Sequence, residues 1–262
     1  MISILGFPYD EKSSFQRGPA LAPPIIREFY KSSGHSTFGE NGIDTISNMI
    51  EDVGDFVISE YFDIEKRCTE LLVQNKRLLS LGGDHSITYP ILKAYHKFHP
   101  RIHILVVDAH TDLYDEYQGD KYNHACPFAR IMEDGIAEQL VQVGIRTLNP
   151  HQREQADRFG VSIVEMKDYH LWEIPELKGP VYLSIDLDGL DPAFAPGVSH
   201  QEPGGLTTRD VIDIIHSIKV PLIGADIVEY TPQNDVQNTT AYVAAKLMKE
   251  ILSKMLSDSL KP

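Results

Sequence analysis

The sequence predicts a single α/β domain over residues 1–262, with a mostly parallel β-sheet and helices on both faces. Short apolar segments of strand length recur along the chain and alternate with segments of helical character. No internal repeat, low-complexity tract or linker interrupts this alternation. A length of 262 residues also fits one domain with a large core.

Eight segments are expected to form the strands. Several of them are apolar at successive positions, which is typical of strands buried on both faces of a parallel sheet. The segment 45–53 has the weakest pattern of the eight. In chain order, the expected strands are 2–7, 45–53, 78–83, 102–108, 139–145, 161–166, 181–188 and 222–229.

Four intervening segments have helical patterns. The segment 22–33 follows the first strand, and 59–77 spaces its apolar residues at helical intervals. The segment 207–218 starts with Thr207 as N-cap and has Asp210 three residues later, an arrangement that marks a helix start. The segment 240–256 is expected to be a long amphipathic helix.

The composition narrows the choice of partners and compartment. A formal net charge of −14 argues against nucleic acid or an anionic membrane and suits a cationic ligand, although it also simply aids solubility. We expect no membrane span and no signal peptide, because long apolar runs and a basic N-terminal region are missing. The two cysteines, Cys68 and Cys126, form no CxxC pair, so we expect a reduced, cytoplasmic protein.

Reactive residues collect where four expected strands end. In open α/β sheets, ligands bind beyond the carboxyl ends of the strands. Carboxylates buried together repel each other and need a cation, and an oxygen-rich set with two imidazoles favours Mn²⁺ or a similar hard ion over a thiolate zinc site. The four groups are Asp84 with His85; Asp108, His110 and Asp112; Asp186, Asp188 and Asp191; and Asp226 with Glu229.

The spacing within these groups suggests how they converge. Residues two apart in a strand point to the same side, so Asp108, His110 and Asp112 would converge if the strand extends that far. One such motif alone is more typical of a turn, whereas three at three strand ends indicate a metal site. We expect Asp191 to fix a turn before Pro192, and Asp84 to orient a ligand imidazole.

Three motifs resemble the signatures of the arginase–agmatinase ureohydrolase family. They are "GGDHS" at 82–86, "DAHTD" at 108–112 and "SIDLDGLDP" at 184–192, and the resemblance extends over nearly the whole chain. It implies a three-layer α/β/α domain with a mostly parallel eight-stranded sheet and two Mn²⁺ ions per subunit. It also implies that Asp108 and Asp186 bridge the two ions. The first ion would be held by His85, Asp108, Asp112 and Asp186, and the second by Asp108, His110, Asp186 and Asp188.

The same resemblance implies hydrolysis of a terminal guanidinium group to urea and an amine. The guanidinium group stays protonated at neutral pH and its carbon is a poor electrophile, which a metal-bound hydroxide can overcome. Glu229 resembles the guanidinium-binding glutamate of the family, and His124 its mobile acid–base histidine. Without the resemblance, His124 would be interpreted as a surface-loop histidine.

The far end of the substrate is expected to face segment 113–125. Several segments, such as "GVSHQEPGG" at 197–205, resemble plant-type arginases of the agmatinase-like branch. We therefore expect an arginase, converting L-arginine to L-ornithine and urea, with agmatinase (agmatine to putrescine and urea) or another guanidino-compound hydrolase as alternatives. Asn123 and His124 are expected substrate contacts. The acidic Asp115, Glu116 and Asp120 would favour an amine-only substrate if they pointed inward, but we expect them in solvent.

Two alternatives from other classes are less favoured. A zinc deacetylase-like enzyme shares the fold and part of the metal set, but His85 and Asp112 distinguish this chain from it. A non-catalytic guanidinium-binding protein would be indicated by loss of a metal ligand or of His124, and all of these are present. The expected partners are therefore a small cationic guanidino substrate and, as the resemblance implies, further copies of the chain in a homo-oligomer, a trimer or hexamer.

Overall fold

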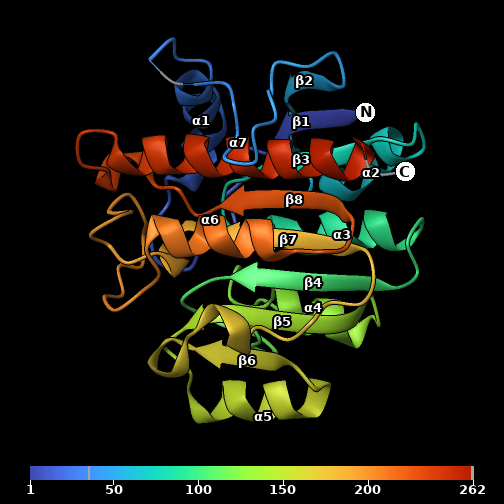
Figure 1. Cartoon of the computed structure of the whole chain (residues 1–262). Helices are drawn as coiled ribbons and strands as arrows, with labels where there is room; N and C mark the ends of the chain where they lie inside the picture. Colours follow the sequence, from blue (N-terminus) through green and yellow to red (C-terminus); the bar gives the residue numbers. More distant parts are fainter. Residues whose placement is uncertain (35, 261–262) are drawn as a thin grey trace.

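Eight parallel strands form one continuous sheet in the computed structural model, which describes residues 1–34 and 36–260 (Figure 1). Their order is β2-β1-β3-β8-β7-β4-β5-β6, and every neighbouring pair is parallel. All eight expected strands are present: β1 (Ile2–Gly6), β2 (Ile50–Asp55), β3 (Arg77–Leu81), β4 (Ile102–Val107), β5 (Ala137–Ile145), β6 (Ser162–Glu165), β7 (Val181–Asp186) and β8 (Leu222–Val228).

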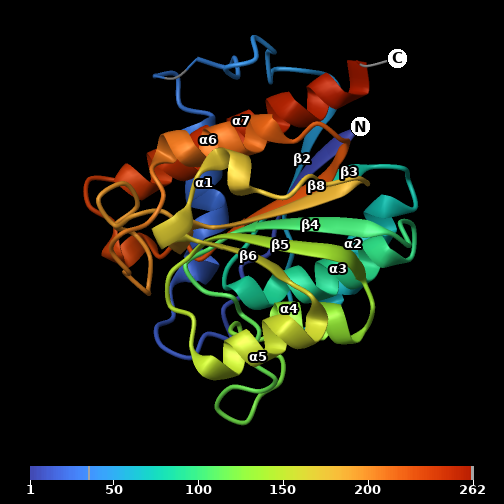
Figure 2. The same cartoon turned by 60° about the horizontal axis from the view of Figure 1, so that its bottom comes forward.

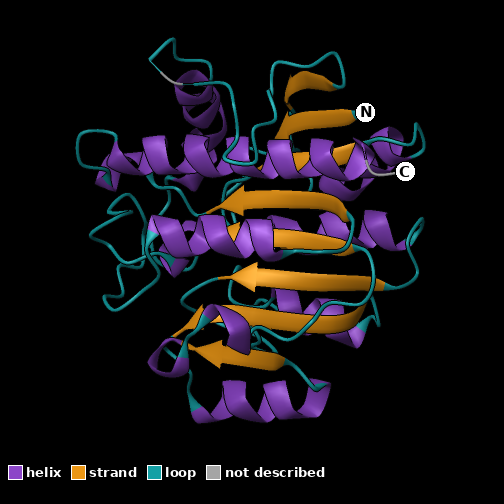
Figure 3. Cartoon of the chain, in the orientation of Figure 1, coloured by secondary structure: helices purple, strands orange, loops and turns teal. Residues whose placement is uncertain are grey.

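Helices cover both faces of the sheet and complete the three layers (Figures 2 and 3). One face packs against α1 (Ala22–Tyr30), α6 (Thr208–Ser217) and α7 (Thr239–Leu260). The other face packs against α2 (Asp63–Leu72), α3 (Thr88–His96), α4 (Pro127–Glu133) and α5 (Pro150–Phe159). Each interface is an apolar core, so the expected fold class is confirmed and the sheet is parallel throughout. Among the described residues, no helix has the length and apolar character needed to cross a membrane.

The four expected helices are present, but α3, α4 and α5 were not predicted. The helix α3 has only nine residues, most of them buried, and contains Pro90, so its helical pattern is weak. The helix α4 has only seven residues, and α5 is mostly polar. The predicted capping box of α6 is observed, because Thr207 accepts a hydrogen bond from the Asp210 amide and Asp210 accepts one in return.

The sheet order explains why the motifs meet. The four strands that end in reactive residues, β3, β8, β7 and β4, are consecutive neighbours in the sheet. Because all strands are parallel, their carboxyl ends lie at one edge. Residues more than a hundred positions apart in the chain are thereby brought together at that edge.

Candidate metal centre

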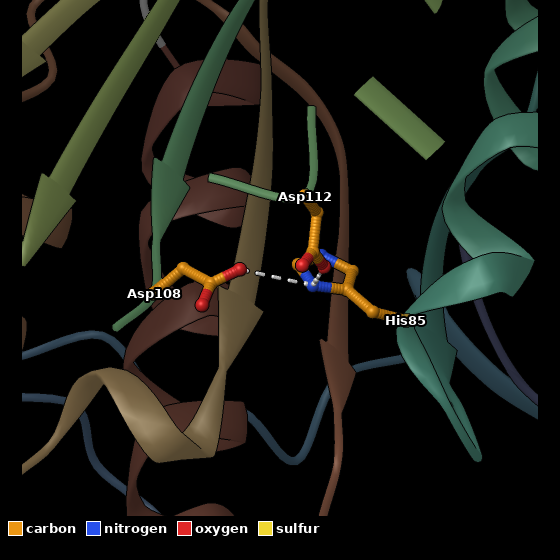
Figure 4. A group of neighbouring side chains, drawn as sticks. All are labelled: His85, Asp108 and Asp112. Carbon is orange, nitrogen blue, oxygen red and sulfur yellow. Dashed lines mark ion pairs between the residues drawn. The ribbon is translucent and has the colours of Figure 1, made fainter. Parts of the chain in front are cut away.

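The first group of potential ligands surrounds the imidazole of His85, which follows β3. Its Nδ1 atom lies 3.1 Å from a carboxylate oxygen of each of Asp108, Asp112 and Asp186. Figure 4 shows the side chain of His85 and those of Asp108 and Asp112, from the segment after β4, pointing toward one another. All four side chains are buried or nearly so, and three of them form a compact group that can hold a metal ion.

A second group shares one carboxylate with the first. The Nδ1 atom of His110 lies 3.0 Å from Asp188 Oδ2 and 3.6 Å from Asp108 Oδ1. The two oxygens of Asp108 therefore face different histidines, Oδ2 toward His85 and Oδ1 toward His110. Asp108 thus belongs to both groups, as a carboxylate bridging two cations would.

The local backbone differs from the expected extended strand. The strand β4 ends at Val107, and the segment 108–112 is a turn in which the His110 amide donates to Asp108 Oδ1 at 2.6 Å. Asp112 has a φ of 48°, in the left-handed region. The prediction that strand alternation aligns Asp108, His110 and Asp112 is therefore wrong; the side chains converge because the chain turns immediately after the strand.

The six side chains fit a cation chemically. His85 Nδ1 and Asp108 Oδ2 are both buried without a hydrogen-bond partner, a state that is unfavourable for either atom unless a ligand is bound. Burial, with repulsion from Asp188 and then Asp108, raises the pKa of Asp186 well above its usual value. Positive charge at this point relieves both penalties, and imidazole nitrogen with carboxylate oxygen suits a hard divalent ion.

A second layer of polar groups fixes the orientation of His85. Its Nε2 atom lies 2.9 Å from Ser184 Oγ, which donates to Asp226 Oδ1 at 2.6 Å. Asp226 is fully buried and also accepts hydrogen bonds from Thr88 and Tyr182. Asp84, which we expected to orient the imidazole, instead accepts hydrogen bonds from the backbone of Lys12 and from the side chains of Ser13 and Ser86.

Asp191 and Arg146 hold the segment that carries Asp188. As predicted for Asp191, its carboxylate fixes a turn, accepting from the Ala193 amide and from the amides of residues 204 and 205. The Arg146 guanidinium donates to several backbone carbonyls, including that of Asp188 at 2.7 Å. Five donors in a rigid fork allow one side chain to fix this irregular loop.

Glu229 and His124 form a buried pair beside the metal ligands. His124 Nδ1 lies 2.8 Å from Glu229 Oε1, which also accepts the backbone N–H of His85. Glu229 Oε2 is buried and has no hydrogen-bond partner among the described residues. Burial alone would lower the pKa of His124, but the Glu229 carboxylate outweighs it and raises that pKa to about 9.

These groups line a cavity of about 220 Å³. Its wall contains His110, Asp112, His124, Asp186, Asp188 and Glu229 from the expected set. Sequence analysis had not singled out the seven further residues of the wall, which are Ser14, Tyr114, Tyr117, Ala125, Thr147, Gln152 and His200. Four of these lie in segments that had attracted attention, Tyr114, Tyr117 and Ala125 in segment 113–125 and His200 in "GVSHQEPGG". The other three lie on loops or on the unpredicted helix α5.

The structure does not bring Asn123 into the cavity wall. Its side chain is buried, and its Oδ1 accepts a hydrogen bond from the Ala125 amide at 3.1 Å. Of the acidic loop residues, Asp115 pairs with Arg130 and Asp120 with Lys12, and neither these nor Glu116 lines the cavity. The acidic character of this loop is therefore directed away from the site.

A parallel sheet that gathers cation ligands at its carboxyl edge, beside a buried acid–base pair, is the arrangement of a metal-dependent hydrolase of the α/β/α type. Comparison with known proteins identifies the family. The family model described as "Arginase family" matches residues 1–253, and the chain belongs to that family, whose members act on C–N bonds of guanidino groups.

Individual relatives agree with this assignment. Arginase 1 of Arabidopsis thaliana is 46% identical, over 97% of this chain and 80% of that protein. A Gallus gallus agmatinase is 32% identical, over 95% of this chain and 79% of that protein. Among solved structures, an arginase from Medicago truncatula superposes with a TM-score of 0.89 at 39% identity, covering 97% of this chain and 87% of the other.

The same comparison corrects the expected location. Several plant relatives are named mitochondrial, and one chloroplastic/mitochondrial, so the prediction of a cytoplasmic protein is wrong. The prediction depended on the scarcity of cysteine, and a low cysteine count indicates only a reducing environment. It does not distinguish the cytosol from the interior of an organelle.

Proposed function

We propose that this chain is an arginase that hydrolyses L-arginine to L-ornithine and urea at a binuclear manganese centre. One observation carries the proposal. Two His/Asp groups share Asp108 and adjoin Glu229, whose buried Oε2 is an acceptor without a partner in the described part of the chain. This arrangement suits a cationic, planar group presented to a pair of cations.

Six residues would hold the metal ions. His85, Asp112, Asp108 and Asp186 would hold one ion, and the distances from His85 Nδ1 to the three carboxylates support this set. His110, Asp188 and Asp108 would hold the other, supported by the distances from His110 Nδ1. Asp186 would be the second shared ligand, as the family resemblance implies. When bound, two such ions supply a hydroxide nucleophile at neutral pH. The second layer of Ser184 and Asp226 would keep the imidazole of His85 in its ligating orientation.

Glu229 and His124 would act on the substrate. The free Oε2 of Glu229 accepts a guanidinium N–H, which gives a partner to a buried oxygen that otherwise has none among the described residues. His124 lies beside it on the cavity wall and supplies the proton that the departing amine needs.

The opposite side of the cavity favours arginine over agmatine. Glu229 follows β8 and Gln152 lies after β5, with β7 and β4 between them, so the two residues are about 14 Å apart in the strand-spacing direction. We call this side, formed by Gln152 and Tyr114, the far wall, and its hydrogen-bond donors are neutral. Gln152 Nε2 has no partner among the described residues, and the Tyr114 hydroxyl accepts from Asn149 and can still donate its own proton. Neutral donors suit the α-carboxylate of arginine, which agmatine lacks.

The test is a comparison of urea release from arginine, agmatine and 4-guanidinobutyrate after loading with Mn²⁺. Arginine should have the highest kcat/KM. A higher value for agmatine would replace the arginase assignment by agmatinase, and no urea from any of the three would reject the proposed function. We also propose assembly into a trimer or hexamer, and a monomeric mass by light scattering would reject that part.

A further inference from the structure

The His124 imidazole is held at both of its nitrogen atoms. Its Nδ1 lies 2.8 Å from Glu229 Oε1, and its Nε2 is contacted by Ser14. The Ser14 backbone N–H lies 3.2 Å from Nε2 and the Ser14 hydroxyl 2.8 Å from it. Because a backbone N–H can only donate, this contact fits the neutral ring, in which Nε2 is the acceptor and the proton on Nδ1 is donated to Glu229. The protonated ring, which the raised pKa of His124 favours at neutral pH, carries a proton on both nitrogen atoms.

The loop that carries Ser14 is itself anchored to the metal-binding motif. Both the Lys12 amide and the Ser13 hydroxyl donate to Asp84 Oδ2, at 3.0 and 3.2 Å. Asp84 is fully buried and directly precedes the ligand His85. This explains why a carboxylate at that position does not contact the imidazole: it fixes the N-terminal loop instead.

A second set of contacts joins this loop to the His124 segment. The His124 amide donates to the Lys12 carbonyl at 3.2 Å, and the Lys12 ammonium pairs with Asp120 at 2.7 Å. Ser14 is therefore placed by two independent anchors, Asp84 on one side and the 120–124 segment on the other. It also lines the cavity, so its hydroxyl acts within the site and not behind it.

We propose that Ser14 is the positioning residue that keeps His124 oriented when its Nε2 carries a proton. The proposal rests on the proposed function, in which His124 is the proton donor. Of the two Ser14 groups at Nε2, the backbone N–H can hold only the unprotonated nitrogen. The hydroxyl can rotate and accept, so it alone can stabilise the protonated ring.

Substrate binding makes this contact more important. A guanidinium group bound at the free Oε2 of Glu229 shares the carboxylate charge that holds His124 Nδ1 at Oε1, and so weakens that contact. The hydroxyl of Ser14, at the other nitrogen, then contributes more to the orientation of the imidazole. Loss of the hydroxyl should therefore reduce proton delivery, while substrate affinity, which depends on Glu229 and the far wall, should change little.

The direct test compares Ser14→Ala with Ser14→Thr in the Mn²⁺-loaded enzyme. Removal of the hydroxyl should lower kcat about 10-fold, the effect of one hydrogen bond to a charged group, with KM within about 2-fold. The alkaline limb of the kcat–pH profile should move to lower pH, because the protonated ring loses an acceptor. Ser14→Thr keeps a hydroxyl and should restore both, and Ser33→Ala, at an exposed serine, is the matched control.

A double-mutant cycle with His124→Asn separates positioning from general destabilisation. If Ser14 acts through His124, Ser14→Ala should have little further effect on kcat in the His124→Asn background. The same cycle, followed by thermal unfolding, should give non-additive Tm shifts without reference to activity. Additive effects in both readouts, or full activity and an unchanged pH profile for Ser14→Ala, would overturn the inference.

The outcomes for this inference and for the proposed function are distinguishable. A wild-type protein without activity on any guanidino compound would reject the function, while the Tm cycle would still report on the Ser14–His124 contact. An active wild type with a fully active Ser14→Ala variant would reject the positioning role alone.

Discussion

Substitution of Gln152 by glutamate should shift the substrate preference from arginine toward agmatine. Gln152 is the third residue of α5, and its Oε1 accepts the Asn149 amide at 3.1 Å while its Nε2 has no partner among the described residues. Glutamate keeps the first contact and is favoured at this helix position. The second oxygen then replaces the Nε2 donor, so a negative charge enters the far wall without loss of the helix cap.

The size of the effect follows from Coulomb's law. Two unit charges about 6 Å apart interact by roughly 3 kcal/mol at an effective dielectric constant of about 20, and solvent in an open cavity halves this to about 1.4 kcal/mol, or 10-fold. The α-carboxylate of arginine is repelled and loses a donor. Agmatine has no carboxylate to be repelled, and its terminal ammonium is attracted. The arginine-to-agmatine ratio of kcat/KM should therefore fall by at least about 10-fold.

The assay is urea release from both substrates by the Mn²⁺-loaded variant, with Gln118→Glu as the control. Gln118 is an exposed residue of segment 113–125 that does not line the cavity, so its replacement by glutamate adds the same charge away from the site. A ratio that changes by less than about 2-fold, or equally in both variants, would refute the placement of the far end of the substrate against Gln152.

Three further predictions concern the metal ions, the acid–base pair and a buried glutamate. Chelation should abolish urea release and lower Tm, because the clustered carboxylates Asp108, Asp112, Asp186 and Asp188 then repel each other without a cation between them. Addition of Mn²⁺ should restore both activity and Tm. Full activity of the metal-free protein would contradict the binuclear site. His124→Asn should retain bound metal but lower kcat by roughly 100-fold, and unchanged turnover would exclude the proton-donor role. Burial would raise the pKa of Glu250, but His216 and Lys246 lower it from 4.5 to about 2. The lowered pKa stabilises the folded protein by on the order of 3 kcal/mol above pH 4.5, and this stabilisation is lost as the pH falls toward 2. In metal-free protein, Glu250→Gln should therefore reduce the fall in the free energy of unfolding between pH 4.5 and 2. An unchanged pH dependence would refute the role of Glu250.

The strands and the ligand set were predictable because they depend on local sequence. Most of the strands are short apolar runs, with the polar β2 as the exception. The chemical types of the residues at the ends of β3, β4 and β7 can be identified without knowledge of the exact backbone there. The convergence of Asp108, His110 and Asp112 was predicted for the wrong reason. Strand alternation was assumed, whereas a turn forms because Asp108 accepts the backbone N–H two residues later.

Gln152 and the support of His124 were not predictable from local sequence, whereas Tyr114 lies in segment 113–125, which was expected to face the far end of the substrate. Ser14 is 110 residues from His124 in the sequence. Gln152 lies on α5, a helix that was not predicted because it is mostly polar. Neither position has a motif of its own. Both depend on where the parallel sheet places its carboxyl ends, which is a property of the strand order and not of any single segment.

Backbone strain connects the fold to the site independently of the motifs. In the described part of the chain, six residues other than glycine have positive φ, and four of them, Asn75, Gln118, Gln237 and Asn238, are exposed amides in turns or loops. The other two, Asp112 and Glu229, are buried acids on the cavity wall. Such a conformation costs of order 1 kcal/mol or more and persists only where the surroundings impose it.

For Glu229, the group that imposes the conformation can be identified, since the Glu229 amide donates to the carbonyl of residue 83 at 2.9 Å. The bend there sends Glu229 into the cavity while Asp226, three residues earlier, stays beneath His85, so one strand serves both the substrate side and the support of a metal ligand.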